Sequence, residues 1–253
     1  MKKTVLGINI NLVNYLDSII CIKAWALAGN SHVVFAANVH MLMEAHDSPD
    51  FKKILNQADM ITPDGMPLVW ILCLKGVKNQ TRVYGPTLML HVLEMAAEEQ
   101  IPVGFYGAND QTLQKLILRI NELFPRLKVA YAFSPPFRPV DKQESAKIAV
   151  DISASGARIL FVGLGCPKQE KWMADQQGKI PAVMLGVGAA FDFLAGTKSQ
   201  APAWMQAIGL EWFFRFIHEP RRLARRYLYN NPRFILLALA DLLGILNKGN
   251  KEA

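Results

Sequence analysis

The chain of 253 residues is 51% hydrophobic, which is enough for a large buried core and excludes disorder as its default state. Its three cysteines are widely spaced and odd in number, so they argue against a disulfide framework and for a reducing compartment. The formal net charge of +7 suggests an anionic partner, and the kind of partner depends on where the basic residues lie.

The sequence predicts neither a secretory signal nor a membrane span. Polar residues interrupt the stretch that follows Lys2 and Lys3, which makes it a poor secretory signal. The apolar run at residues 234–246 contains Asp241 and is too short to span a bilayer. No CxxC or HExxH motif is present, so there is no case for zinc.

The first half of the chain alternates apolar strands with helices. Residues 5–13 have the pattern of an opening strand in a small hairpin-like start, and Asp110 is placed to cap a helix that runs to residue 124. Residues 81–84 fit either a brief strand or a loop. The other predicted elements are strands at 32–37, 59–62 and 102–106 and helices at 16–27, 41–58 (broken near 48–49), 68–74 and 88–99.

The second half continues this alternation and then becomes helical only. The predicted elements are strands at 128–133, 159–162 and 182–187, helices at 142–155 and from 168, and a proline-rich loop at 134–139. Helices alone follow residue 204, so a boundary at 199–202 divides an α/β core, residues 1–200, from a helical appendage, residues 201–253. Strands that alternate with helices indicate a mostly parallel sheet, which binds ligands at the C-terminal ends of its strands.

One stretch, ARILFVGLGCPKQEKW at residues 157–172, runs from a buried strand through glycines into the first turn of a helix. Gly163 and Gly165 break the strand, and Pro167 stands where a helix begins. The backbone N–H groups of such a turn favour a phosphate. On this stretch alone, an ordinary strand–helix turn with glycines for tight geometry is an equally good interpretation.

Asp64 is the strongest candidate for chemistry, because Pro63 and Gly65 hold it at a strand end. A single carboxylate facing a sugar hydroxyl can act as a general base, and an ordinary aspartate, with a pKa of about 4, is ionised at neutral pH. The competing interpretation is that Asp64 caps the helix that starts at Met66, and without further context the cap is favoured.

Other polar residues also follow predicted strands, each with an ordinary alternative. Asn38 either faces a ligand or ends its strand in a loop, and Arg82 is either a bidentate phosphate contact or a surface arginine. Gln169 and Glu170 either reach a ribose or base or are solvated first-turn residues. Asp192 stands between aromatic residues, so it is either a ligand contact or a hub of structural hydrogen bonds.

Basic residues concentrate late in the chain, where aromatic residues are interleaved with them and an apolar helix follows. This combination suits an anionic membrane surface, whereas no recognised nucleic-acid-binding fold accompanies it. The competing interpretation is a helix pair packed on the core with its arginines in water. The arginines are Arg215, Arg221, Arg222, Arg225, Arg226 and Arg233.

Taken in order, six segments resemble the WecG/TagA/CpsF family of bacterial glycosyltransferases over nearly the whole chain. They are TPDGM at 62–66, RVYG at 82–85, VGLGCPKQEKW at 162–172, GVGAAFDFLAG at 186–196, GLEW at 209–212 and EPRR at 219–222. The resemblance implies a Rossmann-like inverting enzyme that moves a hexose from a UDP-sugar to a polyprenyl-diphosphate-linked sugar in cell-surface or exopolysaccharide biosynthesis. It further implies a cytoplasmic enzyme, peripheral at the inner face of the membrane and compatible with a homo-oligomer.

On this resemblance the catalytic residues are Asp64, as the base, and Arg82, on the phosphate side. The substrate-binding residues are Asn38, Thr62, Gly85, Thr87 and Gly107. The nucleotide-binding residues are Gly163, Gly165, Pro167, Gln169, Glu170, Gly188 and Asp192. The residues that meet the membrane or the diphosphate are Arg215, Arg221, Arg222, Arg225 and Arg226.

Three positions, Ala37, Thr87 and Gln200, depart from the family pattern around the sugar-facing strand ends and the appendage hinge. They leave the donor open between an N-acetylmannosamine type and a glucose type. The chain has no Asp-x-Asp pair, so we expect a metal-independent transfer without a cofactor. A nicotinamide dehydrogenase is disfavoured because the glycine turn lacks a third glycine, whereas a nucleotide-sensing, membrane-attached scaffold remains the alternative.

Overall fold

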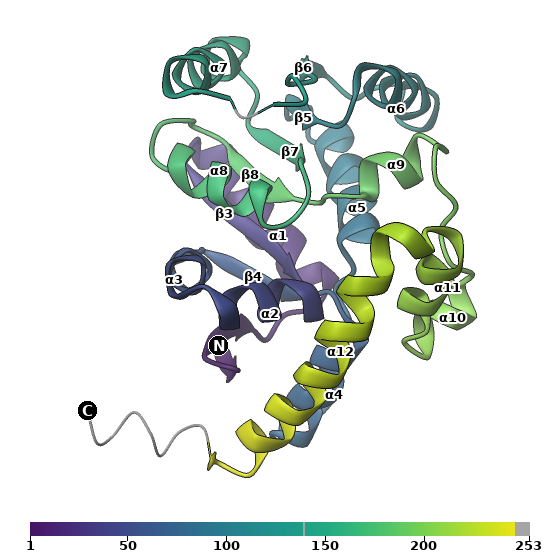
Figure 1. Cartoon of the computed structure of the whole chain (residues 1–253). Coiled ribbons are helices and arrows are strands. Elements are labelled where there is room, and N and C mark those ends of the chain that lie inside the picture. The colour runs from purple at the N-terminus through teal and green to yellow at the C-terminus, as the bar shows by residue number, and fades with distance from the viewer. Residues whose placement is uncertain (139, 246–253) are drawn as a thin grey trace.

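Figure 1 shows the computed structural model, which describes residues 1–138 and 140–245. Residue 139 of the predicted proline-rich loop and residues 246–253 of the predicted appendage lie outside the described residues. Its centre is a six-stranded sheet in the order β4-β3-β8-β7-β5-β6, with every neighbouring pair parallel. The predicted mostly parallel α/β sheet is therefore confirmed. In chain order the strands are β3 (His32–Ala37), β4 (Met60–Pro63), β5 (Val103–Gly107), β6 (Val129–Phe133), β7 (Ile159–Gly163) and β8 (Val183–Gly186).

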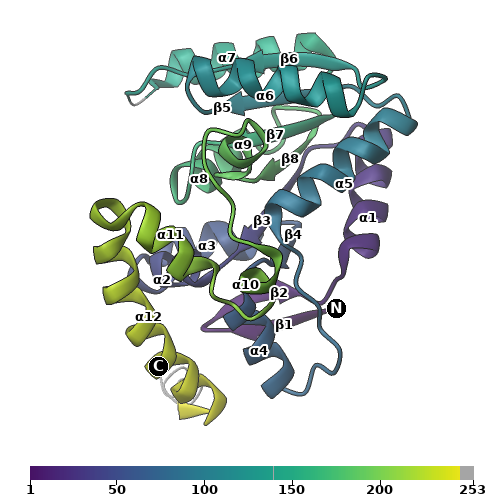
Figure 2. The same ribbon diagram turned by 90° about the vertical axis from the view of Figure 1, so that its right-hand side faces the viewer.

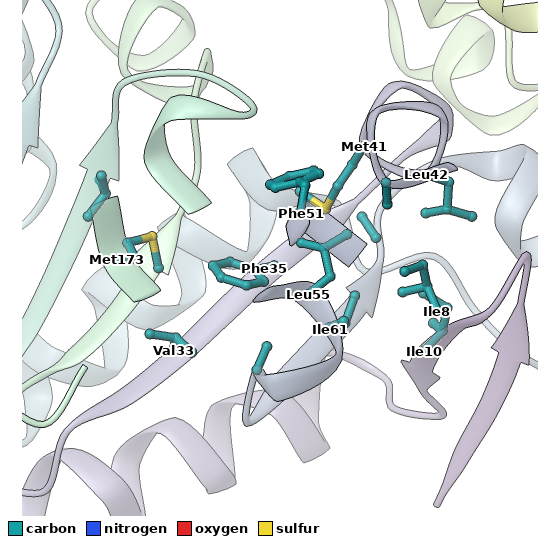
Figure 3. Close-up of a cluster of buried hydrophobic side chains, with 14 of the residues drawn as sticks. Ile8, Ile10, Val33, Phe35, Met41, Leu42, Phe51, Leu55, Ile61 and Met173 are labelled. Atoms are coloured by element: carbon teal, nitrogen blue, oxygen red, sulfur yellow. The ribbon is translucent and has the colours of Figure 1, made fainter. Parts of the chain in front are cut away.

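Helices cover both faces of the sheet (Figures 1 and 2). One face carries α2 (Val39–Asp47), α3 (Pro49–Gln57), α7 (Lys142–Ser155) and α8 (Lys168–Gln176). The other carries α1 (Tyr15–Ala28), α5 (Gly85–Glu98), α6 (Asp110–Leu123) and α9 (Ala190–Leu194). Each layer closes its own apolar core. Figure 3 shows part of the first core, in which Phe35 of β3 lies among side chains of α3 and Met173 of α8.

From β3 to β6 along the sheet, neighbouring strands send their following helices to opposite faces. The strand β3 is followed by α2 on one face, whereas its neighbour β8 is followed by α9 on the other. The neighbours β7 and β5 diverge in the same way into α8 and α6. Such points open crevices at the C-terminal ends of parallel strands. The fold therefore favours ligand binding along this one edge of the sheet.

The chain opens with an antiparallel hairpin of β1 (Lys2–Val5) and β2 (Ile8–Asn11), which confirms the expected hairpin-like start. The apolar side chains of Val5 and Ile8 are fully buried in the core. The Asn11 side chain accepts a hydrogen bond of 2.9 Å from the Ile61 backbone N–H, so the hairpin is tied to β4.

Three predicted helix boundaries can be compared with the structure. The predicted helix break is real, because Ser48 caps α3 and Pro49 occupies its first turn. The predicted cap at Asp110 is wrong: Asn109 is the cap of α6, and its side chain accepts from the Thr112 N–H at 2.8 Å. Residues 81–84 form a loop, and α5 begins directly after it at Gly85.

The last described part of the chain is helical, as predicted, with α10 (Ala203–Ala207), α11 (Glu211–His218) and α12 (Pro220–Leu242). The long helix α12 runs beside α4 (Met66–Leu74), away from the sheet (Figures 1 and 2). Asp241 of α12 is buried, and it accepts from Lys75 Nζ at 2.7 Å and from the Leu6 N–H at 3.0 Å. Across residues 1–138 and 140–245, no helix combines the length and the apolar composition needed to cross a membrane.

Candidate active site

Asp64 follows β4 directly, so it lies at the C-terminal edge of the sheet. Its carboxylate Oδ1 accepts a hydrogen bond of 2.6 Å from the Gly85 N–H, and the Asn38 side chain supplies another. Gly65, rather than Asp64, precedes α4 as its cap residue, and α4 has no side-chain cap. The interpretation of Asp64 as the cap of α4 is therefore wrong. Its carboxylate instead lies at the N-terminus of α5, where backbone N–H groups favour negative charge.

Asp64 is only 8% exposed, and its burial raises the pKa of the carboxyl group to about 6. The nearby Arg82 guanidinium opposes that shift, while the charge of Glu211 adds to it. The expectation of an ordinary aspartate with a pKa of about 4 is corrected accordingly. At pH 7 roughly 90% of the group remains ionised. Its higher basicity makes it a better proton acceptor than an exposed aspartate.

Arg82 is fully engaged by neighbours from the core and from the appendage. Its Nη2 forms an ion pair of 2.6 Å with Glu211 Oε2, and its Nε donates to the backbone carbonyl of Asp64. The guanidinium also stacks on the ring of Tyr84 at 4.0 Å, and the Tyr84 hydroxyl donates to Glu211 Oε1 at 2.9 Å. Helix α11 is thus joined to the edge of the sheet next to Asp64.

Asn38 and His40 form the opposite wall. Asn38 caps α2, since its Oδ1 accepts from the Met41 N–H at 3.2 Å, and it also contacts Asp64. The His40 ring is hydrogen-bonded to the backbone of Cys166, which lies in the bend that follows β7. Burial, and secondly the charge of Arg226, lowers the pKa of His40 to about 4. His40 is therefore neutral at pH 7 and links the 163–170 bend to the Asp64 site.

These residues line a cavity of about 690 Å³ between the sheet edge, α4 and the three C-terminal helices. Its ionisable and amide side chains near Asp64 are Asn38, His40, Asp64, Arg82, Glu211, Arg215 and Arg226. Most of the remaining lining is apolar and comes from α4 and α12, while Ile208, Leu210 and Trp212 add apolar side chains from the segment around α11. The volume falls within the range of small-molecule sites.

The predicted arginine set divides into two groups. Arg215 and Arg226 line the cavity, and the Nε of Arg226 is buried without a hydrogen-bond partner among the described residues. Burial lowers the pKa of Arg226, and the charge of Arg215 lowers it further. By contrast, Arg221, Arg222 and Arg225 are exposed and lie outside the cavity.

The bend after β7 packs closely on its neighbours. A Cβ on Gly107 would lie 2.6 Å from the Gly163 carbonyl, and a Cβ on Gly163 would lie 2.6 Å from the Phe191 ring. Both glycines are therefore required by close packing of β5, β7 and α9. Helix α8 starts at Lys168, and Pro167 is its cap residue, as the sequence indicates.

Gln169 and Glu170 brace this bend from within the protein. Gln169 is 4% exposed; its Oε1 accepts from the Gly165 N–H at 3.1 Å, and it lies beside Gly188. Its Nε2 donates to Glu170 Oε1 at 2.8 Å, while Glu170 Oε2 has no partner among the described residues. Glu170 is fully buried, which raises its pKa to about 7. The alternative of two solvated first-turn residues is therefore wrong.

The other predicted site residues lie around this centre. Thr62 is fully buried, and its hydroxyl donates to the Val83 carbonyl at 3.5 Å rather than facing the cavity. Thr87 lines a smaller neighbouring cavity of about 250 Å³. Asp192 is partly buried and forms an ion pair of 3.0 Å with Lys198. This contact fits the structural role that was one of the two interpretations of Asp192.

Asp64 and the 163–170 bend share one edge of the sheet but do not touch. Two strands, β3 and β8, separate β4 from β7. Three inter-strand spacings place the two sites about 14 Å apart. No residue of the bend lines the large cavity. The bend is connected to the cavity through His40, which lines it and is hydrogen-bonded to Cys166. An extended ligand is needed to reach both places.

Sequence reasoning assigned no role to three residues that build the site. Glu211 lies in the GLEW segment and Tyr84 in the RVYG segment, and both were quoted only as parts of a pattern. His40 follows Asn38 by two positions, which places it in the first turn of the helix that Asn38 caps. This position, two residues after a strand-end asparagine, is a signal that could have identified His40.

Comparison with known proteins gives the class first: the chain is a glycosyltransferase. It belongs to the "Glycosyl transferase WecG/TagA/CpsF family", whose family model matches residues 3–248. Two similar proteins are both called N-acetylglucosaminyldiphosphoundecaprenol N-acetyl-beta-D-mannosaminyltransferase. The one from Bacillus subtilis (strain 168) is 27% identical over 92% of this chain and 88% of its own length. The one from Bacillus spizizenii (strain ATCC 23059 / NRRL B-14472 / W23) is 30% identical over 81% of this chain and 78% of its own length.

Proposed function

We propose that the chain transfers a hexose, of the N-acetylmannosamine or glucose type, from a UDP-sugar to a polyprenyl-diphosphate-linked sugar. The observation that carries this proposal is the buried Asp64 side chain at the polar end of a cavity that is also lined by three arginines, Arg82, Arg215 and Arg226. The names of the two relatives support the acceptor class, because both describe an acceptor whose sugar diphosphate is attached to undecaprenol.

In this mechanism Asp64 accepts the proton of the acceptor hydroxyl as that oxygen attacks the anomeric carbon of the donor. The new C–O bond forms as the bond to the UDP oxygen breaks on the opposite face, so the configuration inverts. The proton moves to Asp64, and the electron pair leaves with UDP. The raised pKa of Asp64, about 6, suits a base that works near neutral pH.

The donor would span the edge of the sheet, with its nucleotide on the 163–170 bend and its sugar near Asp64. Their separation of about 14 Å suits an extended sugar nucleotide. We assign the N–H groups of the bend to the nucleotide, with Gln169 and Glu170 holding its shape. Arg226, Arg215 and Arg82 would stabilise diphosphate charge, and Arg82 must then exchange its pairing with Glu211 for a phosphate contact.

We further propose that the transfer needs no metal ion and takes place at the inner face of the cell membrane. The exposed Arg221, Arg222 and Arg225 would contact anionic lipid headgroups there. The other predicted substrate contacts, Thr62, Thr87 and Asp192, would act around the sugar and the nucleotide.

The test is a screen of UDP-sugars with a short-chain lipid-diphosphate acceptor, read by mass spectrometry. A product whose mass rises by one hexose or N-acetylhexosamine, with inverted anomeric configuration by NMR, is expected. UDP binding without turnover of any donor would instead favour the scaffold alternative. Loss of activity with EDTA that magnesium restores would contradict metal independence.

A further inference from the structure

The large cavity has two chemically different ends. Near the sheet edge it holds Asp64, Arg215 and Arg226. Farther along α12, beyond Phe234, every residue that lines it is apolar. A cavity with this division fits an amphiphilic ligand whose charged head and hydrocarbon tail are joined end to end.

The apolar end is a cleft between α4 and α12, which we define by Ile71, Leu74, Phe234, Ile235, Leu239 and Leu242. Its floor is closed, because Ile71 is 6% exposed and Phe234 is 3% exposed. Its rim is open to water, since Leu74 is 72% exposed and Leu239 is 52% exposed. Exposed apolar side chains that border a groove mark a binding surface for hydrocarbon.

The two helices are fixed to each other at the outer end of this cleft. Lys75 directly follows the last residue of α4, Leu74, and forms an ion pair of 2.7 Å with Asp241 of α12. The lining residues of α4, from Met66 to Leu74, cover about 12 Å of helix axis. The cleft is therefore preformed and is long enough for the beginning of an extended hydrocarbon chain.

We propose that this cleft binds the first isoprene units of the acceptor's lipid chain, while the polar end of the same cavity receives the sugar diphosphate. This inference rests on the proposed function and extends it. The cleft is continuous with the Asp64 site, and Arg215 and Arg226 at the polar end of the cavity would then serve the acceptor's diphosphate as well as that of the donor. A diphosphate joined to a prenyl chain supplies both chemistries in the order in which the cavity presents them.

The test measures the affinity of two probes by calorimetry, farnesyl diphosphate and dimethylallyl diphosphate, which share a head and differ in chain length. The full chain is expected to bind farnesyl diphosphate at least about tenfold more tightly, because its additional isoprene units bury more hydrocarbon. Leu239→Trp fills the cleft and is expected to reduce this ratio at least about fivefold. Leu236→Trp is the matched control, since Leu236 lies on the same helix, is 68% exposed and does not line the cavity.

Equal affinity of the unmodified chain for both probes would overturn the inference. The inference would also be overturned if Leu239→Trp and Leu236→Trp changed the ratio of the two affinities equally. If neither variant changes the ratio and both strengthen binding to phosphatidylglycerol vesicles, the rim contacts bilayer acyl chains and the inference fails. This test measures binding alone and is independent of the donor screen. If the screen finds no transfer but the chain still prefers farnesyl diphosphate, the proposed transfer is contradicted and the assignment of the cleft is not.

Discussion

Two acidic side chains at the same edge of the sheet are withdrawn from water in different surroundings. Asp64 is 8% exposed, opens onto the large cavity and lies beside Arg82. Glu170 is fully buried, and the hydrogen bonds of its carboxylate are with Gln169 and Cys166 of its own bend. Burial raises the pKa of both, to about 6 and about 7. The difference teaches that access to the cavity, rather than a shifted pKa, separates a candidate base from a structural brace.

The largest expected effect separates these two carboxyl groups. With saturating donor, Asp64→Asn is expected to lower the transfer rate by about 10²- to 10⁴-fold, because a general base is lost. Glu170→Gln keeps the hydrogen bond to Gln169 and is expected to retain the rate within a few-fold. Single-turnover rates with the best donor of the screen measure both. A variant Asp64→Asn that transfers as fast as the unmodified chain would remove Asp64 from the chemistry.

The second effect is on stability. The folded pKa of Asp64, about 6, lies above its ordinary value of 3.8, so its contribution to the unfolding free energy falls as pH rises from about 4 to about 6. At pH 7 the buried charge then costs about 2 to 3 kcal/mol. Asp64→Asn is expected to recover about 2 kcal/mol at pH 7 and little near pH 4, measured by urea unfolding.

Asp192→Asn is the control for that measurement. Asp192 forms an ion pair with Lys198 and is not expected to gain stability when neutralised. An Asp64→Asn variant with the same stability as the unmodified chain at both pH values would show that its carboxylate is well solvated.

Breaking the link between the appendage and the sheet edge should have a smaller effect. Glu211→Gln removes the charge that holds Arg82 and is expected to lower kcat/KM about tenfold. Because Glu211 raises the pKa of Asp64, this variant should also shift the acid limb of the pH–rate profile to lower pH. An unchanged limb in Glu211→Gln would mean that the two carboxylates do not interact.

The smallest effect compares arginines inside and outside the cavity. Arg225→Gln is expected to weaken binding to anionic vesicles about fivefold while leaving transfer to a water-soluble acceptor unchanged. Arg226→Gln is expected to do the reverse, because Arg226 lines the cavity. Vesicle co-sedimentation and acceptor kinetics measure the two effects. If the two variants behaved alike in both assays, the division of the arginines into a cavity group and a membrane group would be contradicted.

Local features of this fold were predictable from sequence because nearby residues determine them. The strand at 32–37 was predicted with its observed bounds from an apolar run, and the Ser48–Pro49 pair marked the break between α2 and α3. The prediction of Asp110 as a cap failed, because the adjacent Asn109 takes that role.

The assembly of the site depends on contacts that sequence patterns do not contain. Arg82 and Glu211 are 129 positions apart, so their pairing appears only when α11 packs on the sheet edge. The packing of α12 likewise decides that Arg226 faces the cavity and Arg225 does not. Asp64 was found from its turn residues, but the shift of its pKa follows from burial by distant segments.

The most direct test of Asp64 as a buried base is the pH dependence of kcat/KM for the acceptor. The rate is expected to fall below a pKa of about 6, because protonated Asp64 cannot accept the hydroxyl proton, and Glu170→Gln should leave that limb in place. A limb near pH 4, or a limb near pH 7 that disappears in Glu170→Gln, would contradict the assignment.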